Sequence, residues 1–193
     1  LIDGNHSMLS NKEKDLLLSC GENISATVFS HDLLEHQIDS IAMTGGEAGI
    51  ITTSNFSNAQ IKTVDTKHLY DVLSNHQVVV VAGFQGKTEN NEITTIGRGG
   101  SDTSATALAA ALQAEYVDIF TDVNGIMTAD PRVVTKAQKL DTISYTEICN
   151  LAYQGAKVIH PRAVEIAMQA NVPIRVRATK LNDKGTLITN IPE

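Results

Sequence analysis

The chain has 193 residues, of which 42% are hydrophobic and 19% are charged, and it contains no tryptophan. This length suits one sizeable α/β core and is short for two ordinary domains, and the composition excludes a disordered chain. The net charge is −7 and no basic cluster offsets it, so binding along a nucleic-acid backbone is not expected. An anionic small substrate would therefore need a local positive site.

Neither a membrane span nor a secretion signal is expected. The longest apolar strand-like run, residues 78–82, is far too short to span a bilayer, and the opening LIDGNHSMLS lacks the regions of a signal peptide. The chain opens on Leu1 instead of methionine, which suggests a fragment. Cys20 and Cys149 lie in apolar helical patterns, so we expect two buried free thiols in a reducing cytoplasm. The histidines are expected on the solvated surface.

The first half of the chain reads as helices and short strands. Ser10 to Glu13 forms a capping box ahead of an apolar run, which predicts the start of a helix. Gly21 is expected to interrupt that helix, because glycine is a weak helix former, and a second helical pattern follows it. The further elements expected here are a helix at 24–34, a strand at 38–43, a helix at 66–76 and a buried strand at 78–82.

The second half continues the alternation. A second capping box, Ser144 to Glu147, predicts a helix that runs to about residue 154, and Pro161 after His160 predicts another start. The other elements expected are a helix at 103–113 and strands at 117–121, 173–177 and 186–189. Strands that alternate with helices predict an α/β fold, a three-layer αβα sandwich with a mostly parallel sheet. Ligands bind such sheets at the carboxyl ends of the strands, which directs attention to the loops there.

The loop from Gly83 to Asp102 ends in a glycine turn with one arginine. It lacks both the P-loop pattern and the dinucleotide fingerprint. Its glycines allow backbone N–H groups to approach a ligand, the following helix presents its positive end, and Arg98 suits a carboxylate or phosphate. Asp102 would repel such an anion unless Mg²⁺ or a lysine neutralised it. The alternative stays open that Ser101 or Asp102 is an N-cap and the glycines form a turn.

Three further features admit both a functional and a structural interpretation. Residues 121–132 follow a strand and contain two tight turns, so they form either a nucleotide platform, with Arg132 on a phosphate, or a surface connection. Lys157 follows a helix, and its charge either binds a phosphate or interacts favourably with the helix dipole. Glu22, beside the expected helix break, either accepts a substrate ammonium or is solvated.

Four segments, in this order and spacing, resemble the aspartokinases of the amino acid kinase superfamily: GRGGSDTSA, TDVNGIMTADPR, LAYQGAKVIHPRAVEIA and VPIRVRAT. The resemblance covers nearly the whole chain, beginning near SCGE. It implies an amino acid kinase fold that is incomplete at the N-terminus. Residues 1–193 would then form a single partial catalytic domain, with an amino-acid-substrate part at about 1–100 and a nucleotide-binding part at about 101–193.

The resemblance also assigns roles to individual residues. Arg98 matches the arginine that grips the aspartate carboxylate, and Ser101 lies in the same loop. Glu22 matches a glutamate that helps to position the substrate, and Asp102 matches the acidic catalytic residue near the transferred phosphate. The residues that match the nucleotide site are Thr121, Asp122, Met127, which replaces a frequent tyrosine, Arg132 and Lys157. The motifs assign no metal-binding residue.

The implied reaction is the phosphorylation of the L-aspartate β-carboxylate by ATP with Mg²⁺, giving 4-phospho-L-aspartate. This is the first step toward lysine and diaminopimelate, threonine and methionine, in a cytoplasmic enzyme that is expected to be a homodimer. A carboxylate is already ionised at neutral pH, so no general base is needed. Catalysis should rest on positioning and on neutralisation of phosphate charge.

Two departures from the family pattern keep alternatives open. Nothing in the chain matches the Lys-Phe-Gly-Gly-Thr-Ser loop whose lysine binds phosphates, and the chain stops where regulatory ACT domains would follow. We therefore expect the chain to be impaired or inactive by itself. The alternatives are another kinase of the superfamily, acting on acetylglutamate, glutamate or uridylate, and a non-catalytic module that senses an amino acid.

Overall fold

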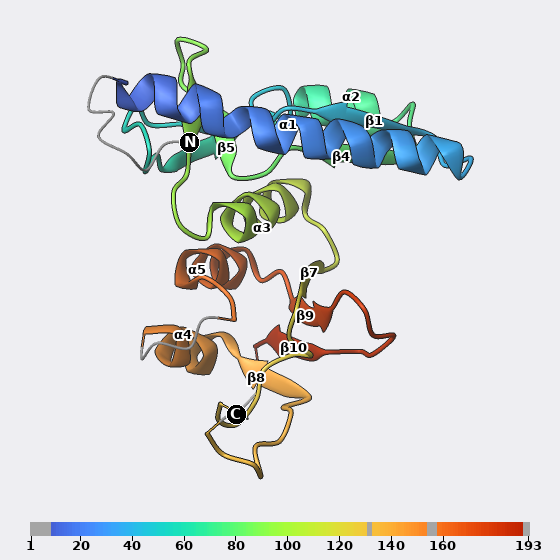
Figure 1. Ribbon diagram of the computed structural model, residues 1–193, viewed down its shortest axis with the longest axis vertical. Helices are drawn as coiled ribbons and strands as arrows, with labels where there is room; N and C mark the ends of the chain where they lie inside the picture. The colour runs from blue at the N-terminus through green and yellow to red at the C-terminus, as the bar shows by residue number, and fades with distance from the viewer. Residues whose placement is uncertain (1–8, 131–132, 154–157, 191–193) are drawn as a thin grey trace. The chain divides into compact units, whose positions relative to one another are not determined.

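A computed structural model describes residues 9–130, 133–153 and 158–190. The chain divides into two compact units, Leu1–Ser104 and Ala105–Glu193, which are described separately below (Figure 1). The sequence-based assignment of an amino-acid-substrate part and a nucleotide-binding part to the two halves stays a prediction. Among the described helices, none combines the length and the apolar character needed to cross a membrane.

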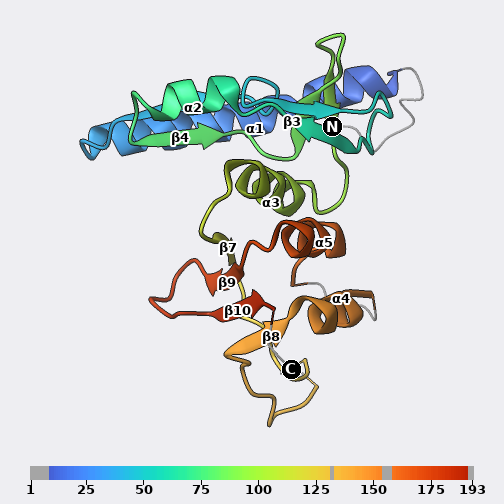
Figure 2. The ribbon, with the colours of Figure 1, turned by 180° about the vertical axis from the view of Figure 1, so that it is seen from behind.

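The first unit contains a two-stranded parallel sheet flanked by helices. Strand β1 (Ser40–Met43) pairs in parallel with β4 (Val78–Val81). Helix α1 (Asn11–Glu35) contacts both strands, and α2 (Lys67–Leu73) contacts β4. Figures 1 and 2, seen from opposite sides, show α1 in front of this pair in one view and α2 in front of it in the other. The side chains of β4 are half-buried, whereas the sequence predicted a buried strand.

The first unit also contains a four-stranded sheet that the sequence did not predict. Its order is β3-β2-β5-β6, from β3 (Ile61–Val64), β2 (Ile50–Thr52), β5 (Gln85–Lys87) and β6 (Ile93–Thr95). The hairpin of β5 and β6 lies inside the segment that was expected to be one long loop. These strands are too short, and too rich in threonine and glycine, to show an apolar alternation.

The second unit is built on the sheet β7-β9-β10-β8. Its strands are β7 (Val117–Thr121), β9 (Ile174–Ala178), β10 (Thr186–Thr189) and β8 (Thr142–Ser144), and its helices are α4 (Tyr145–Tyr153) and α5 (Pro161–Ala170). Helix α3 (Gly100–Leu112) begins in the first unit and continues into the second. An aliphatic cluster that includes Ile119, Ile148 and Ile174 forms the core of the second unit.

The predicted α/β class is confirmed, with mixed sheets. Among the described strands the pairings β1–β4, β2–β5, β7–β9 and β8–β10 are parallel, whereas β2–β3, β5–β6 and β9–β10 are antiparallel. The parallel excess over antiparallel pairings is therefore small.

Both predicted capping boxes are present. The Ser10 hydroxyl accepts from the Glu13 N–H at 3.2 Å, and the Glu13 carboxylate accepts from the Ser10 N–H at 2.8 Å. Ser144 and Glu147 make the same two bonds, at 3.2 and 3.0 Å. The Ser10 and Ser144 hydroxyls also donate to the glutamate carboxylates, and these bonds, followed by those from the serine N–H groups, lower the pKa of both glutamates. His160 caps α5, which has proline at its first position, as predicted.

The predicted break at Gly21 is wrong, because α1 runs without interruption from Asn11 to Glu35. A glycine costs a helix about 1 kcal/mol, and packing along a sheet outweighs such a cost. The prediction of buried thiols is wrong for Cys20, which is exposed, whereas Cys149 is half-buried and burial raises its pKa.

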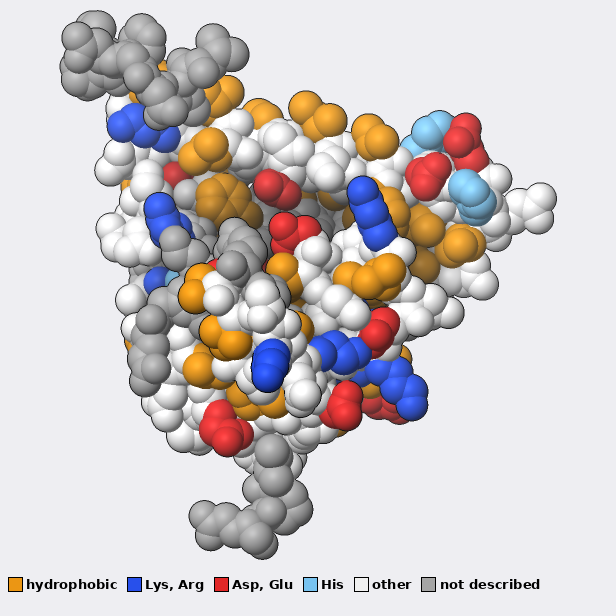
Figure 3. All heavy atoms as spheres, turned by 60° about the horizontal axis from the view of Figure 1, so that its bottom comes forward, with side chains coloured by type: hydrophobic (Ala, Val, Ile, Leu, Met, Phe, Trp, Pro, Cys, Tyr) orange, Lys and Arg blue, Asp and Glu red, His pale blue; other side chains and the backbone are white. Residues whose placement is uncertain are grey.

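Helix α1 buries small and polar residues and exposes apolar ones, which is the reverse of the usual pattern. Its buried residues are Asp15, Ser19, Ala26 and Ser30, whereas its large apolar side chains are exposed apart from Leu33, which is half-buried. Figure 3 shows apolar side chains at the surface in the region where α1 lies. The face that packs on the sheet is therefore small and polar.

Candidate functional site

The turn that carries Arg98 has a backbone that requires glycine. Gly97 and Gly99 have φ values of 82° and 66°, in the left-handed region where only glycine is unstrained. Helix α3 then begins at Gly100, where a Cβ atom would lie 2.7 Å from the ring of Phe84. The backbone geometry therefore requires glycine at these positions, in addition to any advantage that glycine gives for the approach of a ligand.

The interpretation of Ser101 or Asp102 as an N-cap is wrong. The helix already begins at Gly100, so both residues lie within its first turn. Ser101 is exposed and Asp102 is half-buried. A carboxylate in the first turn interacts favourably with the helix dipole, and this remains a structural role for Asp102. Arg98 is exposed at the approach to the same helix end.

Ser104 ties the first turn of α3 to the start of β5. Its hydroxyl accepts from the Phe84 N–H at 3.1 Å and lies 2.9 Å from the Gly100 carbonyl, to which it donates. Phe84 has a φ of 65°, which is unusual for a bulky residue, so the bond holds a strained backbone. A Cβ atom on Gly83 would lie 3.1 Å from the Ser104 hydroxyl, which shows how closely these segments approach.

Gln85 links the start of β5 to helix α1. Its side chain is buried, and Nε2 donates to the Ser19 carbonyl at 3.2 Å. Glu22 lies about one turn further along α1 and is half-buried. The consecutive residues Phe84 and Gln85 therefore connect the helix of Glu22 with the helix of Ser101 and Asp102.

Asp15 fixes the segments that flank the glycine turn. Its carboxylate is fully buried and accepts from the Ser57 N–H at 2.8 Å and from the Thr95 N–H at 2.9 Å. The Thr95 hydroxyl adds a bond of 2.8 Å. Next to Ser57, the Asn58 side chain lies so close to Gly97 that a Cβ there would meet it at 2.9 Å. The sequence did not reveal the role of Asp15, because a single acidic residue before three leucines resembles a solvent-exposed helix position.

The second unit carries the residues predicted for the nucleotide. Thr121 ends β7, and its carbonyl accepts from the Thr179 N–H at 3.0 Å while its hydroxyl donates to Asp122 at 3.1 Å. Asp122 is exposed, and Met127 is half-buried in a bridge with Lys139. Arg132 and Lys157, also predicted for this site, lie outside the described residues.

The loop after β7 is held by a network that the sequence did not reveal. Asp183 accepts from Lys139 at 2.6 Å, from the Gly185 N–H at 2.8 Å and from Asn124 Nδ2 at 3.2 Å. The Lys139 bond, with the other two, holds the pKa of Asp183 well below its usual range. Asn124 Oδ1 is buried and has no partner within the described part of the chain.

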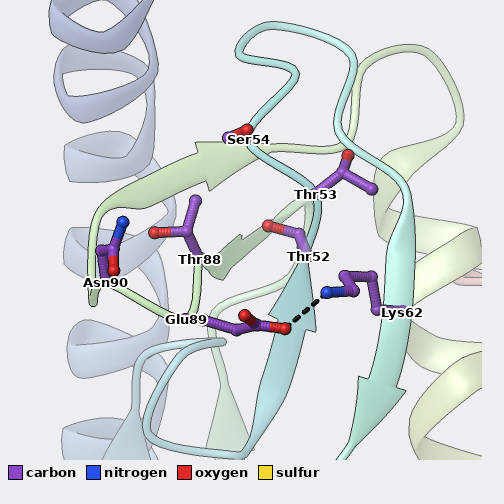
Figure 4. Close-up of a pocket in the computed structure, with 7 residues that line it drawn as sticks. All are labelled: Thr52, Thr53, Ser54, Lys62, Thr88, Glu89 and Asn90. Atoms are coloured by element: carbon purple, nitrogen blue, oxygen red, sulfur yellow. Dashed lines mark hydrogen bonds and ion pairs between the residues drawn. The ribbon is translucent and has the colours of Figure 1, made fainter.

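A polar hollow, which none of the predicted site residues lines, lies on the four-stranded sheet of the first unit (Figure 4). It has a volume of about 330 Å³ and is lined by Thr52, Thr53, Ser54, Lys62, Thr88, Glu89 and Asn90. The side chains of Lys62 and Glu89, which are 47% and 71% exposed, form an ion pair across the hollow. The hydrogen bond and the charge of Lys62 lower the pKa of Glu89. Water screens such an exposed pair, so it contributes little to stability.

The chain is similar to known proteins over most of its length. Residues 3–178 match the amino acid kinase family. "Aspartokinase 1" of Bacillus subtilis (strain 168) is 62% identical over 190 residues, which are 98% of this chain and 47% of that protein. The chain thus spans about half the length of the curated relatives it matches.

Solved structures show the same fold. Escherichia coli aspartokinase III in complex with aspartate and ADP (R-state) superposes with a TM-score of 0.89 at 34% identity, over 97% of this chain and 43% of the other. The uridylate kinase of Archaeoglobus fulgidus, at 20% identity and a TM-score of 0.60 over 94% of this chain and 74% of the other, shares the fold alone. With the family match covering most of its length, the chain belongs to the amino acid kinase family.

Proposed function

We propose that this chain carries the substrate-binding and phosphoryl-transfer residues of an aspartokinase. The reaction would transfer the γ-phosphoryl group of ATP to the β-carboxylate of L-aspartate and give 4-phospho-L-aspartate. The observation that carries the proposal is the glycine turn at the start of α3, which holds an exposed Arg98 beside the first-turn residues Ser101 and Asp102. The high identity to aspartokinases supports the choice of acceptor.

The turn suits an anionic amino acid. A helix start offers N–H groups and a partial positive charge, and Arg98 adds a planar pair of donors that matches a carboxylate. Glu22, on the helix that Gln85 connects to this turn, would accept the substrate ammonium. The selectivity for aspartate over a neutral amino acid would then come from Arg98 and the helix start together.

Asp102 would act near the transferred phosphoryl group. Mg²⁺ commonly binds through one or two protein carboxylates together with substrate phosphates. No group of three or more His, Cys, Asp or Glu side chains suitable for a metal occurs in the described ranges, so Asp102 fits a site in which the nucleotide supplies most of the oxygen ligands. When bound, the ion would neutralise phosphate charge. Since the acceptor is already a carboxylate, no side chain needs to remove a proton.

The second unit would supply the nucleotide site. Thr121 and Asp122 end β7, and Met127 offers a thioether that can pack on a base. Arg132 and Lys157 stay sequence-based proposals for phosphate contacts. We also propose that the enzyme works as a cytoplasmic homodimer in the pathway toward lysine and diaminopimelate, threonine and methionine.

The acceptor can be identified directly. The purified chain would be incubated with ATP, Mg²⁺ and either L-aspartate, L-glutamate, N-acetylglutamate or UMP, and ADP would be measured. Hydroxylamine converts a carboxyl phosphate into a hydroxamate, so any turnover by the chain should give a hydroxamate with L-aspartate and with none of the other acceptors. ADP release that depends on UMP would contradict the proposal.

Ligand-binding measurements distinguish an inactive aspartokinase chain from a wrong assignment of function. We expect the 193-residue chain to turn over slowly or not at all, because it has no match to the phosphate-binding lysine loop. L-Aspartate should nevertheless raise its melting temperature, since a ligand that binds only the folded state stabilises it. Aspartate binding without ATP binding would favour the amino-acid-sensing module instead.

Arg98→Lys tests the carboxylate contact. Lysine keeps the charge but loses the paired donors, so the aspartate KM, or its dissociation constant in the chain alone, should rise about 10- to 100-fold. ATP binding should stay nearly unchanged. An unchanged affinity for aspartate would rule out this role for Arg98.

Asp102→Asn separates catalysis from helix stabilisation. Asparagine fits the same space but carries no charge, so in the complete enzyme kcat should fall by at least about 10-fold while the melting temperature changes little. The affinity for aspartate should be retained, which distinguishes this variant from Arg98→Lys. Full activity would show that Asp102 is mainly structural.

A further inference from the structure

The loop that follows β7 is tied closely to two other segments of the second unit. Residues 122–128 are called the β7 loop. The Leu140 N–H, which lies just before β8, donates to the Ile126 carbonyl at 2.8 Å. The Ile126 N–H donates to the Thr186 hydroxyl, at the start of β10, at 2.8 Å. A Cβ atom on Gly125 would lie only 2.5 Å from the same hydroxyl. Both neighbouring segments therefore set the position of the β7 loop.

Asp183 is the acceptor that joins all three segments. Its carboxylate accepts from Lys139 Nζ at 2.6 Å, from the Gly185 N–H at 2.8 Å and from Asn124 Nδ2 at 3.2 Å, so each donor belongs to a different segment. Arg177 Nε donates to the Asp183 carbonyl at 3.1 Å, which also ties the residue to β9. The Lys139 and Asp183 side chains are 25% and 34% exposed, so solvent weakens their pairing. A local role explains this network better than a large contribution to global stability.

We propose that Asp183 is a positioning residue for the nucleotide, which it holds in place through the β7 loop. The inference rests on the proposed function, which assigns Asp122 and Met127 of this loop to the nucleotide. Asn124 lies between these two residues in the chain, so its bond to Asp183 restrains the loop between its two points of contact with the ligand. Asp183 acts through its donors and is a ligand of neither the nucleotide nor Mg²⁺.

Lys139 extends the same restraint to the far end of the β7 loop. Its backbone forms a bridge with Met127, while its side chain donates to Asp183. The carboxylate therefore restrains the loop at Asn124 directly and at Met127 through Lys139. A loop that is ordered before the ligand arrives loses less conformational entropy on binding, which raises the affinity. Without Asp183 the contacts to the nucleotide are still available but are formed by a smaller fraction of the molecules, so affinity falls and is not abolished.

The affinity of the 193-residue chain for ADP, measured by calorimetry, tests this role. Asp183→Ala should raise the ADP dissociation constant about 10-fold and leave the affinity for L-aspartate unchanged. Asp183→Asn keeps one acceptor oxygen, so it should lose less affinity and can be measured even if the alanine variant folds poorly. Asp118→Ala is the matched control, because it removes a carboxylate of the same unit that pairs with Arg175 and Arg177, and it should retain ADP affinity. Variants of Asp183 that bind ADP as the parent does would overturn this inference alone, whereas a parent that binds no ADP would overturn the proposed nucleotide site as well.

Measurements with and without Mg²⁺ distinguish positioning from metal binding. If Asp183 acts through the β7 loop, Asp183→Ala should weaken ADP binding by the same factor in Mg²⁺ and in EDTA. A loss that appears only with Mg²⁺ would make Asp183 a ligand of the ion and contradict the proposal. Lys139→Met combined with Asp183→Ala should bind ADP no more weakly than Asp183→Ala alone, because both changes break the same connection. Additive losses would show that the two residues act separately.

Hydrogen exchange distinguishes a local role from general stabilisation. Without nucleotide, Asp183→Ala should accelerate exchange in residues 122–128, where the Ile126 N–H depends on the position of the loop, and leave the rest of the second unit as in the parent. Asp118→Ala should not change exchange in residues 122–128. Equal acceleration throughout the second unit of Asp183→Ala would show that Asp183 only stabilises the fold, and the positioning role would be wrong.

Discussion

The two compact units of the chain have interiors of different chemistry. The second unit is held by an aliphatic cluster in which Ile174, Val176 and Ile188 are fully buried. Within its described residues only Thr106 and Thr186 are buried polar residues. The first unit instead buries Asp15, Ser19, Ser30, Ser40, Thr52, Gln85, Thr88, Thr94, Thr95, Thr103 and Ser104.

Several buried polar side chains of the first unit are paired with one another, although the buried Asn23 Oδ1 has no partner within the described residues. The Thr52 and Thr94 hydroxyls lie 2.5 Å apart, and those of Ser30 and Ser40 lie 2.9 Å apart. Hydrogen bonds are directional, whereas apolar packing is not, so such an interior fixes backbone segments at defined angles. The first unit thereby holds the turn around Arg98. The second unit gains stability by burial, which tolerates more variation in geometry.

The largest effect should follow a cavity in the aliphatic core. Ile174→Ala removes a fully buried side chain and should lower the free energy of unfolding by about 4 kcal/mol. Hydrogen exchange measured by mass spectrometry would locate the change, which is useful because the chain has no tryptophan. Exchange should accelerate in residues 105–190 before residues 9–104. Equal acceleration in both ranges would show that the units unfold together. Leu181→Ala, at an exposed position, is the control.

Loss of the buried carboxylate should come next. Asp15→Ala leaves the Ser57 and Thr95 N–H groups without their acceptor and should cost about 3 kcal/mol. The accelerated exchange should now appear in the first unit. Aspartate affinity should also fall, because both segments flank Gly97. Asp15→Asn retains one acceptor oxygen and should lose less; if both variants are as stable as the parent, hydrogen bonds of Asp15 do not hold this unit together.

The smallest effect concerns acid stability of the second unit. Burial raises the pKa of Asp118, but the bonds from Arg175, at 2.6 Å, and Arg177, at 3.3 Å, outweigh burial and hold the pKa below its usual value. A lowered folded pKa gives stability that is present above the unfolded value of about 4 and is lost as the pH falls through the folded pKa. The contribution should be under about 1 kcal/mol, because solvent reaches the pair.

Asp118→Asn should flatten the decline of stability below about pH 4 relative to the parent chain. Urea unfolding at several pH values measures this slope. Asp122→Asn, the same substitution at an exposed position, is the control. A decline as steep in Asp118→Asn as in the parent would show that other carboxylates cause it.

The sequence by itself determined the elements whose signals are local. Both capping boxes and the proline start of α5 join residues that are close in the chain, and the predicted strands at 117–121 and 186–189 match β7 and β10. The resemblance to aspartokinases pointed to the family that the comparisons confirm. The roles of Arg98, Ser101, Asp102 and Glu22 stay predictions.

Tertiary structure decided what depends on distant partners. Asp15 is buried because Ser57 and Thr95, which lie far along the chain, supply its donors. Helix α1 runs through Gly21 and exposes its leucines because the sheet beneath it accepts small polar side chains. The short strands β2, β3, β5 and β6 form through pairing with one another. Local sequence holds no signal for such contacts, since hydrogen-bond pairing and close packing are properties of the assembled unit.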